Sequence, residues 1–498
     1  MGETSKAIRD FARRILPGRV FHCLTRLRDF IYPEERDCAE IGPELVARIL
    51  AADGDFRVVR PTTPPREGVV DRPPRIGIFG NVGNKGYVLA RVLRRMGVEA
   101  DLVLEEGSMD AFLFSRPFWE DLDLSCDTYE QAFAEEGRWQ APEFVRRVPY
   151  QPKALETLGR SRAAVRFVQE TYAGKMGVAL APEKAFLLAL HWDHWPMVEA
   201  MGRYDSVHLS STAIAMGIFC PRPYVVDPIG GDLFTWPFEE NLFGLITRAS
   251  YRNAFATAVA EVNYSRYLDR LGIRRRQFLP ALVDTEVFRP EPDPELTREW
   301  RSLLKARLVL FMTCRQSWEW KGNDLFFRAL RKVVDQGAPV GVVAASWGED
   351  LEKSHALVRE LGLSERVLWL PKASKPRLRR YVSSADVAVD QFVMEGYGTS
   401  VYDAMACARP VLVWDDGRVY REAFDPPPPF LGATDEASIA QRLSEVVAGR
   451  HDLEAIGRRS REWVVRFHGP EELAHRIVAL HREAIGPSGA GATERPSR

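Results

Sequence analysis

The chain of 498 residues is too long for one ordinary domain, since a domain usually takes roughly 150 residues. Hydrophobic residues make up 46% and charged residues 28%, which is the composition of a soluble globular enzyme and excludes wholesale disorder. The 68 basic and 69 acidic residues leave a formal net charge of −1, so no global basic field points to nucleic acid as a partner.

The cysteines and the apolar runs indicate the compartment. Six cysteines are scattered along the chain without a close pair: Cys23, Cys38, Cys126, Cys220, Cys314 and Cys407. A disulfide framework or a structural zinc site needs clustered spacing, so we expect reduced thiols in a cytoplasmic protein. No stretch approaches the ~20 apolar residues that span a bilayer, so no membrane-spanning helix is predicted.

Residues 1–32 form a basic leader with seven lysines and arginines against three acids, and its apolar residues recur at helical spacing. One interpretation is an amphipathic element that lies on the anionic inner face of the membrane as a peripheral contact. The other is a helix that docks its apolar stripe on the protein body. Both interpretations stay open. Together with a proline-rich linker, the leader makes residues 1–74 the first predicted segment.

The first α/β pattern begins at residue 75. A buried strand over 75–80 leads into a glycine-rich turn, a helix over 87–96 and a strand over 100–104. A strand, glycine loop, helix and strand in this order begin a doubly wound parallel sheet. Residues 107–200 are less regular and are interpreted as helical insertions. The remaining predictions in this half are strands over 206–209 and 223–226 and a helical stretch over 239–260.

A second α/β pattern follows a proline-rich connection over 288–294. Its predicted strands cover residues 308–313, 340–345, 367–370, 387–390 and 411–414. Amphipathic helices separate them. We therefore predict an α/β fold with two Rossmann-like domains, over residues 75–288 and over residues 289–486 with the closing helices. Residues 487–498 are predicted to be a disordered tail.

The most informative segment lies between the last two of these strands. Glu395 ends a strand-to-loop passage, and the glycines after it permit a tight turn into a helix that begins near Thr399. Exposed N–H groups at a helix start suit a phosphate, and Asp403, one turn further, can accept hydrogen bonds from a ribose. The candidate donor-binding residues are Gly396, Tyr397, Gly398, Thr399, Ser400 and Asp403. A capped helix start, with Asp403 complementing the helix dipole, is the alternative.

A pair of cations precedes that segment. Arg315 and Lys321 lie six residues apart on one strand-to-helix loop. Such a pair can neutralise a diphosphate, the arginine through two parallel hydrogen bonds and the lysine as a compact charge. A solvated basic loop is the alternative. A phosphate-binding helix start and paired cations in one Rossmann-like unit favour a nucleotide diphosphate as the ligand.

With these motifs in place, the C-terminal half resembles the retaining GT-B glycosyltransferases of the group 1 family. The matching pieces are residues 282–290, Arg315, residues 321–324, residues 361–367, the E-x7-E-like run from Glu395 to Asp403, and the Asp-Ala-Met-Ala helix at 403–406. The resemblance covers residues 278–415 and is weaker over 75–275. The combination is specific, although no single piece is.

The resemblance implies a GT-B architecture, in which two Rossmann-like domains face a central cleft and the second holds most of a nucleotide sugar. It implies transfer of a sugar from a UDP or GDP donor to a glycan or lipid-linked acceptor, as in polysaccharide biosynthesis, with retention of anomeric configuration. It also implies that neither a metal ion nor a cofactor is needed.

The family pattern carries over to four residues of the second domain. Arg315 and Lys321 would stabilise the departing diphosphate, and Glu395 would contact the donor sugar. Asp403 would hold the ribose. Here an aspartate replaces the second glutamate of the family pattern, and one methylene less of reach should weaken or re-aim that contact.

By the same resemblance, the first domain supplies the acceptor side of the cleft. Within it, the loop residues Gly83 and Lys85, aimed at the diphosphate, and Gly231 and Asp232 after a later strand are the donor-binding candidates, and the strand residue His208 is the candidate catalytic group. A histidine on a buried strand is more often a core residue, so that alternative for His208 stays open. Acceptor choice is expected to lie in the irregular insertions.

A nicotinamide-dependent oxidoreductase is the competing enzyme class. Gly80, Gly83 and Gly86 follow a strand, and Glu105 lies about 20 residues on, where an acid can bind a ribose. The spacing is G-x-x-G-x-x-G rather than G-x-G-x-x-G, however, and the two cations of the second domain would then be unexplained.

Two further interpretations are weaker. A catalytically degenerate protein that binds a sugar nucleotide without turnover is motivated by the aspartate at position 403. His191 and His194 have a spacing that can hold zinc on a helix, but no third ligand is identifiable, so no metal site is predicted.

Overall fold

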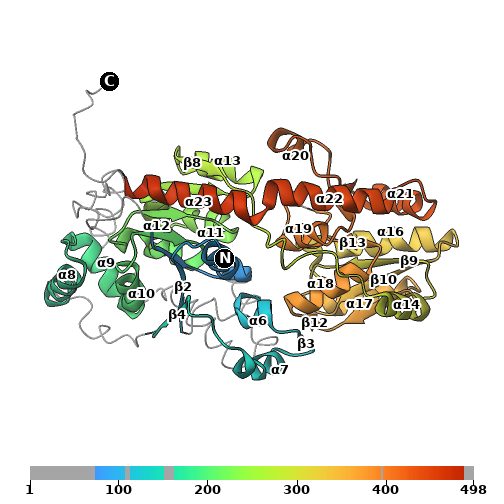
Figure 1. The fold of residues 1–498 in the computed structure, drawn as a ribbon, viewed down its shortest axis with the longest axis horizontal. Coiled ribbons are helices and arrows are strands. Elements are labelled where there is room, and N and C mark those ends of the chain that lie inside the picture. The colour runs from blue at the N-terminus through green and yellow to red at the C-terminus, as the bar shows by residue number, and fades with distance from the viewer. Residues whose placement is uncertain (1–72, 107–112, 151–161, 394–395, 487–498) are drawn as a thin grey trace.

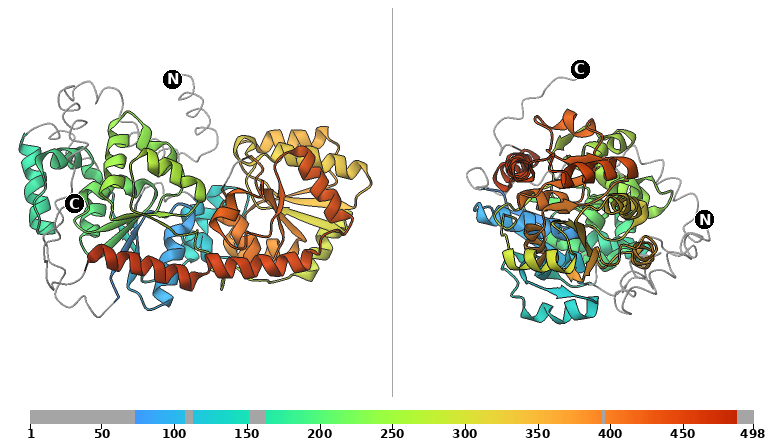
Figure 2. Two further views of the ribbon diagram at one scale, coloured as in Figure 1. Left: turned by 90° about the horizontal axis from the view of Figure 1, so that it is seen from above. Right: turned by 90° about the vertical axis from the view of Figure 1, so that its right-hand side faces the viewer.

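The computed structural model of the protein describes residues 73–106, 113–150, 162–393 and 396–486, and the predicted leader and tail lie outside these ranges. Two parallel sheets dominate the described residues, one in each half of the chain (Figure 1). Figure 2 shows the two halves side by side along the length of the molecule. The predicted α/β fold with two Rossmann-like domains is confirmed.

The first sheet has the order β4-β2-β1-β5-β6-β7-β8, and all its pairings are parallel. Its strands are β1 (Ile76–Phe79), β2 (Ala100–Glu105), β4 (Val145–Val148), β5 (Ser206–Leu209), β6 (Tyr224–Val226), β7 (Ala256–Val259) and β8 (Arg276–Phe278). Every side chain of β1 is buried, as expected for a strand covered on both faces. After β1 the strands β2 and β4 are added on one side, and β5 to β8 are then added on the other side. A ligand crevice is expected where this order reverses, between the carboxyl ends of β1 and β5.

The second sheet has the order β11-β10-β9-β13-β14-β15 and is also parallel throughout. Its strands are β9 (Leu308–Met312), β10 (Val340–Ala345), β11 (Val367–Leu370), β13 (Val387–Val389), β14 (Val411–Trp414) and β15 (Leu431–Ala433). The predicted strands in this half are confirmed to within a residue. The same rule places a ligand crevice at the carboxyl ends of β9 and β13.

Two predictions for the first half were wrong. The region predicted as helical insertions contains the strands β3 (Ser125–Cys126) and β4 as well as helices. The predicted helix over 239–260 ends at Asn253, and β7 follows it. A short apolar run does not reveal by periodicity whether it is a strand or the end of a helix, which explains the second error.

Helices cover both faces of each sheet. In the first half, α5 and α23 share a core with one face, and α9, α10 and α12 share a core with the other. The helices of four or more residues not bounded elsewhere in the text are α5 (Lys85–Arg95), α7 (Tyr129–Ala134), α8 (Arg162–Met176), α9 (Pro182–Leu190), α10 (Trp195–Met201), α11 (Gly231–Phe234), α12 (Leu242–Asn253), α13 (Ser265–Arg270), α14 (Pro294–Leu303), α16 (Asn323–Asp335), α17 (Leu351–Glu360), α18 (Lys375–Ser384), α20 (Val419–Ala423) and α21 (Glu436–Val447). Within the described ranges, no helix is long and apolar enough to cross a lipid bilayer.

The last two helices lie almost end to end across both halves (Figures 1 and 2). Helix α22 (Leu453–His468) packs on the second half, and α23 (Pro470–Ile485) returns to pack on α5, β5 and β6 of the first. At their junction, the His468 ring donates from Nδ1 to the Ala281 carbonyl oxygen at 2.8 Å, and the Val283 amide donates to the His468 carbonyl oxygen at 3.0 Å. The domain boundaries given above stay predictions, and the structure adds that α23 lies with the first sheet.

Candidate functional site

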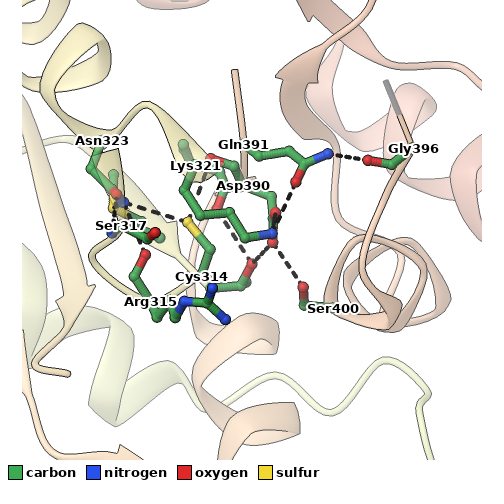
Figure 3. A network of polar contacts seen from close by, with 12 residues as sticks. Cys314, Arg315, Ser317, Lys321, Asn323, Asp390, Gln391, Gly396 and Ser400 are labelled. Atoms are coloured by element: carbon green, nitrogen blue, oxygen red, sulfur yellow. Dashed lines mark hydrogen bonds and ion pairs between the residues drawn. The ribbon is translucent and has the colours of Figure 1, made fainter. Parts of the chain in front are cut away.

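The predicted cation Lys321 lies at the carboxyl edge of the second sheet. It ends the short helix α15 (Trp318–Lys321), and Gly322 follows with a φ of 65°, which turns the chain into α16. The Lys321 ammonium lies 2.9 Å from Oε1 of Gln391 and 3.2 Å from Oδ1 of Asp390, both just after β13 (Figure 3). Burial opposes the charged form of Lys321, but the Asp390 carboxylate outweighs that effect and raises the pKa of the ammonium. The lysine is therefore a fixed cation.

Asp390 connects this cation to the helix start that was predicted to bind phosphate. Its second carboxylate oxygen accepts hydrogen bonds from the hydroxyls of Thr313 and Ser400, each at 2.8 Å. Ser400 is the second residue of α19 (Thr399–Ala406), which begins where the sequence predicted. Among the described residues, no side chain caps the start of α19, so its N–H groups suit an anionic ligand beside Lys321.

The predicted partner Arg315 lies on the loop after β9, at the same edge of the sheet. Its Nε lies 3.1 Å from the Glu349 carboxylate, which also accepts a hydrogen bond from the Ser317 hydroxyl. The Arg315 side chain is 39% exposed. The two predicted cations thus belong to one edge, with the Lys321 side chain 16% exposed and the Arg315 side chain more accessible to a ligand.

The glycine turn before α19 is only partly described, because Glu395 lies outside the described residues. Gly396 has a φ of 96°, and its carbonyl oxygen accepts a hydrogen bond from the Gln391 side chain. A Cβ on Gly396 would lie 3.4 Å from the Asn263 amide of the first domain, so the two domains meet closely here. Gly398 and Thr399 are exposed at the helix start.

The Tyr397 side chain is placed in the core rather than at the site. Its ring stacks on Tyr420 with 4.8 Å between centroids, and its hydroxyl donates to the Trp414 carbonyl oxygen at 2.5 Å. Only the backbone of Tyr397 is available to a donor. The tight turn was predicted correctly, and the burial of this ring could not be read from the motif.

Asp403 is buried and paired with Lys375, whose ammonium lies 2.6 Å from its Oδ2. Burial raises the pKa of Asp403, against the effect of Lys375. Glu120, on α6 (Phe118–Asp121) of the first domain, is close enough to interact with both groups, and burial raises its pKa to about 7. The structure therefore places Asp403 in an interdomain cluster and not with Lys321, and its contact with a ribose stays a prediction.

The glycine loop of the first domain is built for a close turn. Gly80 has a φ of 96°, and a Cβ there would lie 2.2 Å from the Ser210 carbonyl oxygen, so only glycine fits. Gly83 and Asn84 are left-handed, and Lys85 begins α5. The Lys85 ammonium lies 2.6 Å from Oδ1 of Asp227, directly after β6.

His208 lies behind this ion pair and does not reach the cleft surface, since it is 2% exposed. Its Nε2 lies 3.2 Å from the second oxygen of Asp227, and its Nδ1 lies 3.2 Å from Nε2 of His481 on α23. Nδ1 of His481 lies 2.7 Å from the Ser206 hydroxyl. Burial is the largest single effect on the Asp227 carboxylate and raises its pKa. The Lys85 charge and the His208 hydrogen bond together outweigh burial and hold the pKa of Asp227 below its usual value. Asp227 is thus an acceptor, and Nε2 of His208 carries the hydrogen.

The predicted pair Gly231 and Asp232 divides between surface and interior. Asp232 is buried and accepts hydrogen bonds from the backbone amides of Gly230 at 2.7 Å, Ile229 at 3.0 Å and Ser211 at 3.1 Å. Burial raises its pKa to about 6 in spite of these bonds. Its described contacts are structural, whereas Gly231 is exposed at the start of α11.

Sequence reasoning missed the acids that hold the two lysines. Asp227 and Asp390 each follow a buried strand directly, and that position was the available signal. Glu261, two residues after β7, was missed as well. Glu261 extends from the first domain to the Tyr420 hydroxyl of the second at 3.0 Å. Burial raises the pKa of Glu261 to about 7.

The architecture defines the class of protein. Two parallel-sheet domains with facing carboxyl edges make a GT-B fold, and three solved structures share it. Anabaena HepE in complex with UDP-glucose has a TM-score of 0.54 at 16% identity, covering 82% of this chain and 98% of that one. A glycosyltransferase from Rickettsia africae has a TM-score of 0.55 at 12% identity, covering 83% and 99%. Sucrose-phosphate synthase from Thermosynechococcus elongatus has a TM-score of 0.53 at 15% identity, covering 82% and 98%.

The second domain gives the more particular match. Residues 297–463 match the model of the family described as glycosyl transferases group 1. This range holds Arg315, Lys321, Asp390 and α19. The family that the sequence resembled is thus matched independently over the second sheet and its helices.

Curated relatives agree over part of their length. A GDP-mannose-dependent alpha-(1-6)-phosphatidylinositol monomannoside mannosyltransferase from Mycolicibacterium smegmatis is 25% identical over 222 residues, 42% of this chain and 57% of the relative. A D-inositol 3-phosphate glycosyltransferase from Mycobacterium bovis is 33% identical over 134 residues, 26% of this chain and 27% of the relative. The chain therefore spans about half or less of the length of these relatives.

Proposed function

We propose that the protein is a glycosyltransferase that moves a sugar from a nucleotide diphosphate donor to a glycan or lipid-linked acceptor, with retention of anomeric configuration. The observation that carries the proposal is the partly buried Lys321 ammonium, held by Asp390 and Gln391 beside the uncapped start of α19. A fixed cation and a helix start at one sheet edge are what a departing diphosphate requires.

In this proposal the chemistry is leaving-group stabilisation. Lys321 contacts the diphosphate as a point charge, Arg315 binds it through its guanidinium, and the N–H groups of α19 complete the shell. Protein cations would thus neutralise the charge that develops as the glycosidic bond breaks. Because Asp390 fixes Lys321 beforehand, little reorganisation is needed in the transition state.

The first domain would face the reacting sugar from the other side of the cleft. Lys85 presents its ammonium there, and Asp227 positions it, with His208 acting through Asp227 as a positioning residue. The acceptor would attack on the face from which the diphosphate leaves, which requires two oriented substrates more than a protein nucleophile.

The donor base is proposed as uracil or guanine. One relative named as GDP-mannose-dependent supports GDP, and the likeness to a fold solved with UDP-glucose supports UDP. A thermal-shift series with UDP, GDP, ADP and NAD separates these options. We expect UDP or GDP to stabilise the protein, and stabilisation by NAD alone would overturn the proposal.

The oxidoreductase alternative loses support at the residue that motivated it. Glu105, which would bind a ribose, is buried, and its carboxylate lies 2.8 Å from Nδ1 of His194. The Gly83 amide donates to the Ser115 hydroxyl at 3.2 Å.

Turnover itself separates the transferase from a degenerate binding protein, and the anomeric signal of the product in a proton NMR spectrum tests retention.

We also propose that the protein works at the cytoplasmic face of a membrane, through the basic leader over residues 1–32. Co-sedimentation with vesicles of phosphatidylglycerol and phosphatidylcholine measures this contact. Binding should disappear when residues 1–32 are deleted and the remaining chain stays folded. Unchanged binding, or unfolding on deletion, would contradict the membrane role.

A further inference from the structure

A small lobe of the first domain extends to the second and is here named the clasp. It comprises residues 113–139, between β2 and β4, and contains the short helix η4 (Leu113–Ser115), α6, β3 and α7. It has a core of its own, formed by Leu113, Phe118, Trp119, Leu124, Cys126 and Ala132. The clasp is thus a folded unit and not a loose connection.

The clasp is anchored in the glycine loop of the first domain by buried amide side chains. Asn81 donates to the Ser115 carbonyl oxygen at 2.6 Å, and Asn84 donates to the Arg116 carbonyl oxygen at 3.0 Å. Both asparagines are fully buried, so neither amide has water as an alternative partner. The same loop presents Lys85 to the cleft, which links the clasp to the candidate site.

At its other end the clasp pairs with the second domain. Strand β3 is antiparallel to β12 (Lys372–Ala373), the two-residue strand that follows β11. The Leu124 amide donates to the Ser374 hydroxyl at 2.8 Å, and the Ser374 amide returns a hydrogen bond to the Leu124 carbonyl oxygen at 3.0 Å. Asp123 and Arg377 add an ion pair at 2.6 Å.

An aromatic stack adds a second point of contact. Phe114 of the clasp lies on Trp347 with 4.4 Å between ring centroids and 28° between the rings. Trp347 follows β10, as β12 follows β11. Both contacts therefore lie at the carboxyl edge of the second sheet, the edge that holds Lys321 and α19. Ligands of open α/β sheets bind along that edge, so the clasp covers part of the proposed donor site.

The two ends of the clasp differ in how firmly they hold. The anchor consists of buried hydrogen bonds. The far end combines the two-residue strand pair, the ring stack, a hydrogen bond from the Lys372 ammonium to the Asp127 carbonyl oxygen, an ion pair with Asp123 half exposed, and the buried Glu120 near Lys375 and Asp403. Apart from Glu120, the side chains that make the ion pair and the lysine contact are accessible to solvent. Exposed ion pairs contribute little, and two-residue strands are marginal. Release is therefore expected at the second domain, with the anchor intact.

We propose that the clasp is a gate for the donor: it separates from β12 and Trp347 to admit the nucleotide sugar and closes over it before transfer. The proposal rests on the proposed function for the identity of the ligand. Its geometric content, which is opening at the β3–β12 pair, is independent of that identity. Closure would exclude water from the donor and limit its hydrolysis.

The strand register offers a direct test. Lys372 lies opposite Cys126 in the β3–β12 pair. Opposite residues of an antiparallel pair have Cα atoms roughly 4.5–5.5 Å apart, within the range of a disulfide. The Lys372→Cys variant should therefore lock the clasp closed when oxidised and release it in dithiothreitol. Mass spectrometry of the digested protein confirms the bond between positions 126 and 372.

Nucleotide entry is measured by stopped-flow with mant-labelled UDP and GDP. We expect the association rate constant of the labelled nucleotide that binds to fall at least tenfold in the oxidised variant and to recover on reduction. The double variant Cys126→Ser, Lys372→Cys is the matched control, since it cannot form the bond, and it should bind at one rate under both conditions. Equal association rates for the locked and the reduced single variant would overturn the proposal.

Hydrogen exchange of the unmodified protein separates this proposal from the proposed function. If neither nucleotide binds to the reduced protein, the proposed function fails, and the clasp is judged by its amides alone. The Leu124 and Ser374 amides should exchange faster than the Ile78 amide in the buried strand β1. Exchange as slow as that of Ile78 would show that the clasp stays closed, and the gate would be refuted.

Discussion

Each domain places a lysine and an aspartate at the carboxyl edge of its sheet. The two pairs differ in the side chains that contact the aspartate. Lys85 pairs with Asp227 at 2.6 Å in the first domain, and Lys321 pairs with Asp390 at 3.2 Å in the second. In both domains the lysine lies at a helix boundary after a central strand of the sheet, which is β1 in the first domain and β9 in the second. The aspartate follows another strand of that sheet.

The difference lies in the groups that hold each aspartate. Behind Asp227 are two histidines, with His208 in contact with Asp227 and His481 in contact with His208. Behind Asp390 are the hydroxyls of Thr313 and Ser400, which do not titrate. The lysine beside the start of α19 is therefore held through hydroxyl groups, whereas the lysine opposite it is held through a pair of hydrogen-bonded histidines.

The largest expected effect is that of Lys321→Ala, which removes the fixed cation of the second pair. Loss of one preorganised donor to a developing charge typically costs about 100- to 1000-fold in kcat, and we expect a loss in that range. Steady-state transfer assays with a sugar donor of the nucleotide that the thermal-shift series selects measure it. Lys332→Ala, on the exposed face of α16, is the matched control and should retain full turnover. An unchanged kcat for Lys321→Ala would remove the diphosphate role.

The second largest effect is expected for Lys85→Met, which keeps the bulk of the side chain and removes its charge. A hydrogen bond to a charged group contributes about 1.5–3 kcal/mol, so turnover should fall roughly 10- to 100-fold. Lys175→Met, at an exposed surface pair of the first domain, serves as the control. If Lys85→Met costs more than Lys321→Ala, the assignment of the leaving-group role to the second pair is reversed.

The burial of His481 should appear as a pH-dependent stability. Burial first, and then the neighbouring His208, lowers the pKa of His481 well below its usual value. The unfolded histidine takes up a proton below about pH 6.5, whereas the folded one stays neutral, so stability is present above pH 6.5 and is lost as the pH falls below it. Between pH 7.5 and 5.5 the free energy of unfolding should fall by about 1.4 kcal/mol relative to His481→Gln.

Urea unfolding at the two pH values gives this difference. Glutamine can keep both hydrogen bonds of His481 but does not titrate, which makes it the appropriate reference. The Ser400→Ala variant, measured in the same way, should follow the unmodified protein between pH 7.5 and 5.5. A parallel pH response of His481→Gln and the unmodified protein would mean that this histidine does not contribute the expected proton.

The smallest effect is expected for Ser400→Ala, which removes one hydroxyl from Asp390. Thr313 remains as a donor, and one hydrogen bond contributes about 1 kcal/mol, so kcat/KM should fall roughly fivefold. Ser400→Thr restores the hydroxyl and should restore most of the activity. A loss as large as that of Lys321→Ala would show that Ser400 contacts the substrate itself.

Part of this arrangement could be predicted from the sequence. Apolar runs with glycine turns located the main strands, and the motif around Lys321 and Thr399 located the sheet edge that is proposed to bind the diphosphate. Asp390 and Asp227 were missed because an acid at the end of an apolar run resembles the end of any strand. Both acquire their meaning from a lysine far along the chain, as the separation of 142 residues between Lys85 and Asp227 shows.

The clasp and the histidine network could not be predicted, for a related reason. Strand β3 has two residues and no periodicity, and it exists because β12 lies opposite, about 250 residues away in sequence. His208 and His481 are 273 residues apart, and neither position has a local pattern that indicates the other. The local sequence pattern determines the helices and strands. Contacts between residues far apart in the sequence determine which side chains are fixed in place.

The return of α23 to the first domain has a consequence for motion. The chain passes between the domains twice, through the connection near Ala281 and through the α22–α23 junction, and His468 bonds the two passages together. A single tether would let one domain swivel freely, but two joined passages leave one axis of rotation. In Figure 1 this axis lies on the side of α22 and α23, and the clasp lies on the opposite side. The junction at His468 and the clasp thus lie on opposite sides of the domain interface, so in the proposed gate a rotation about the junction produces its largest displacement at β3 and β12.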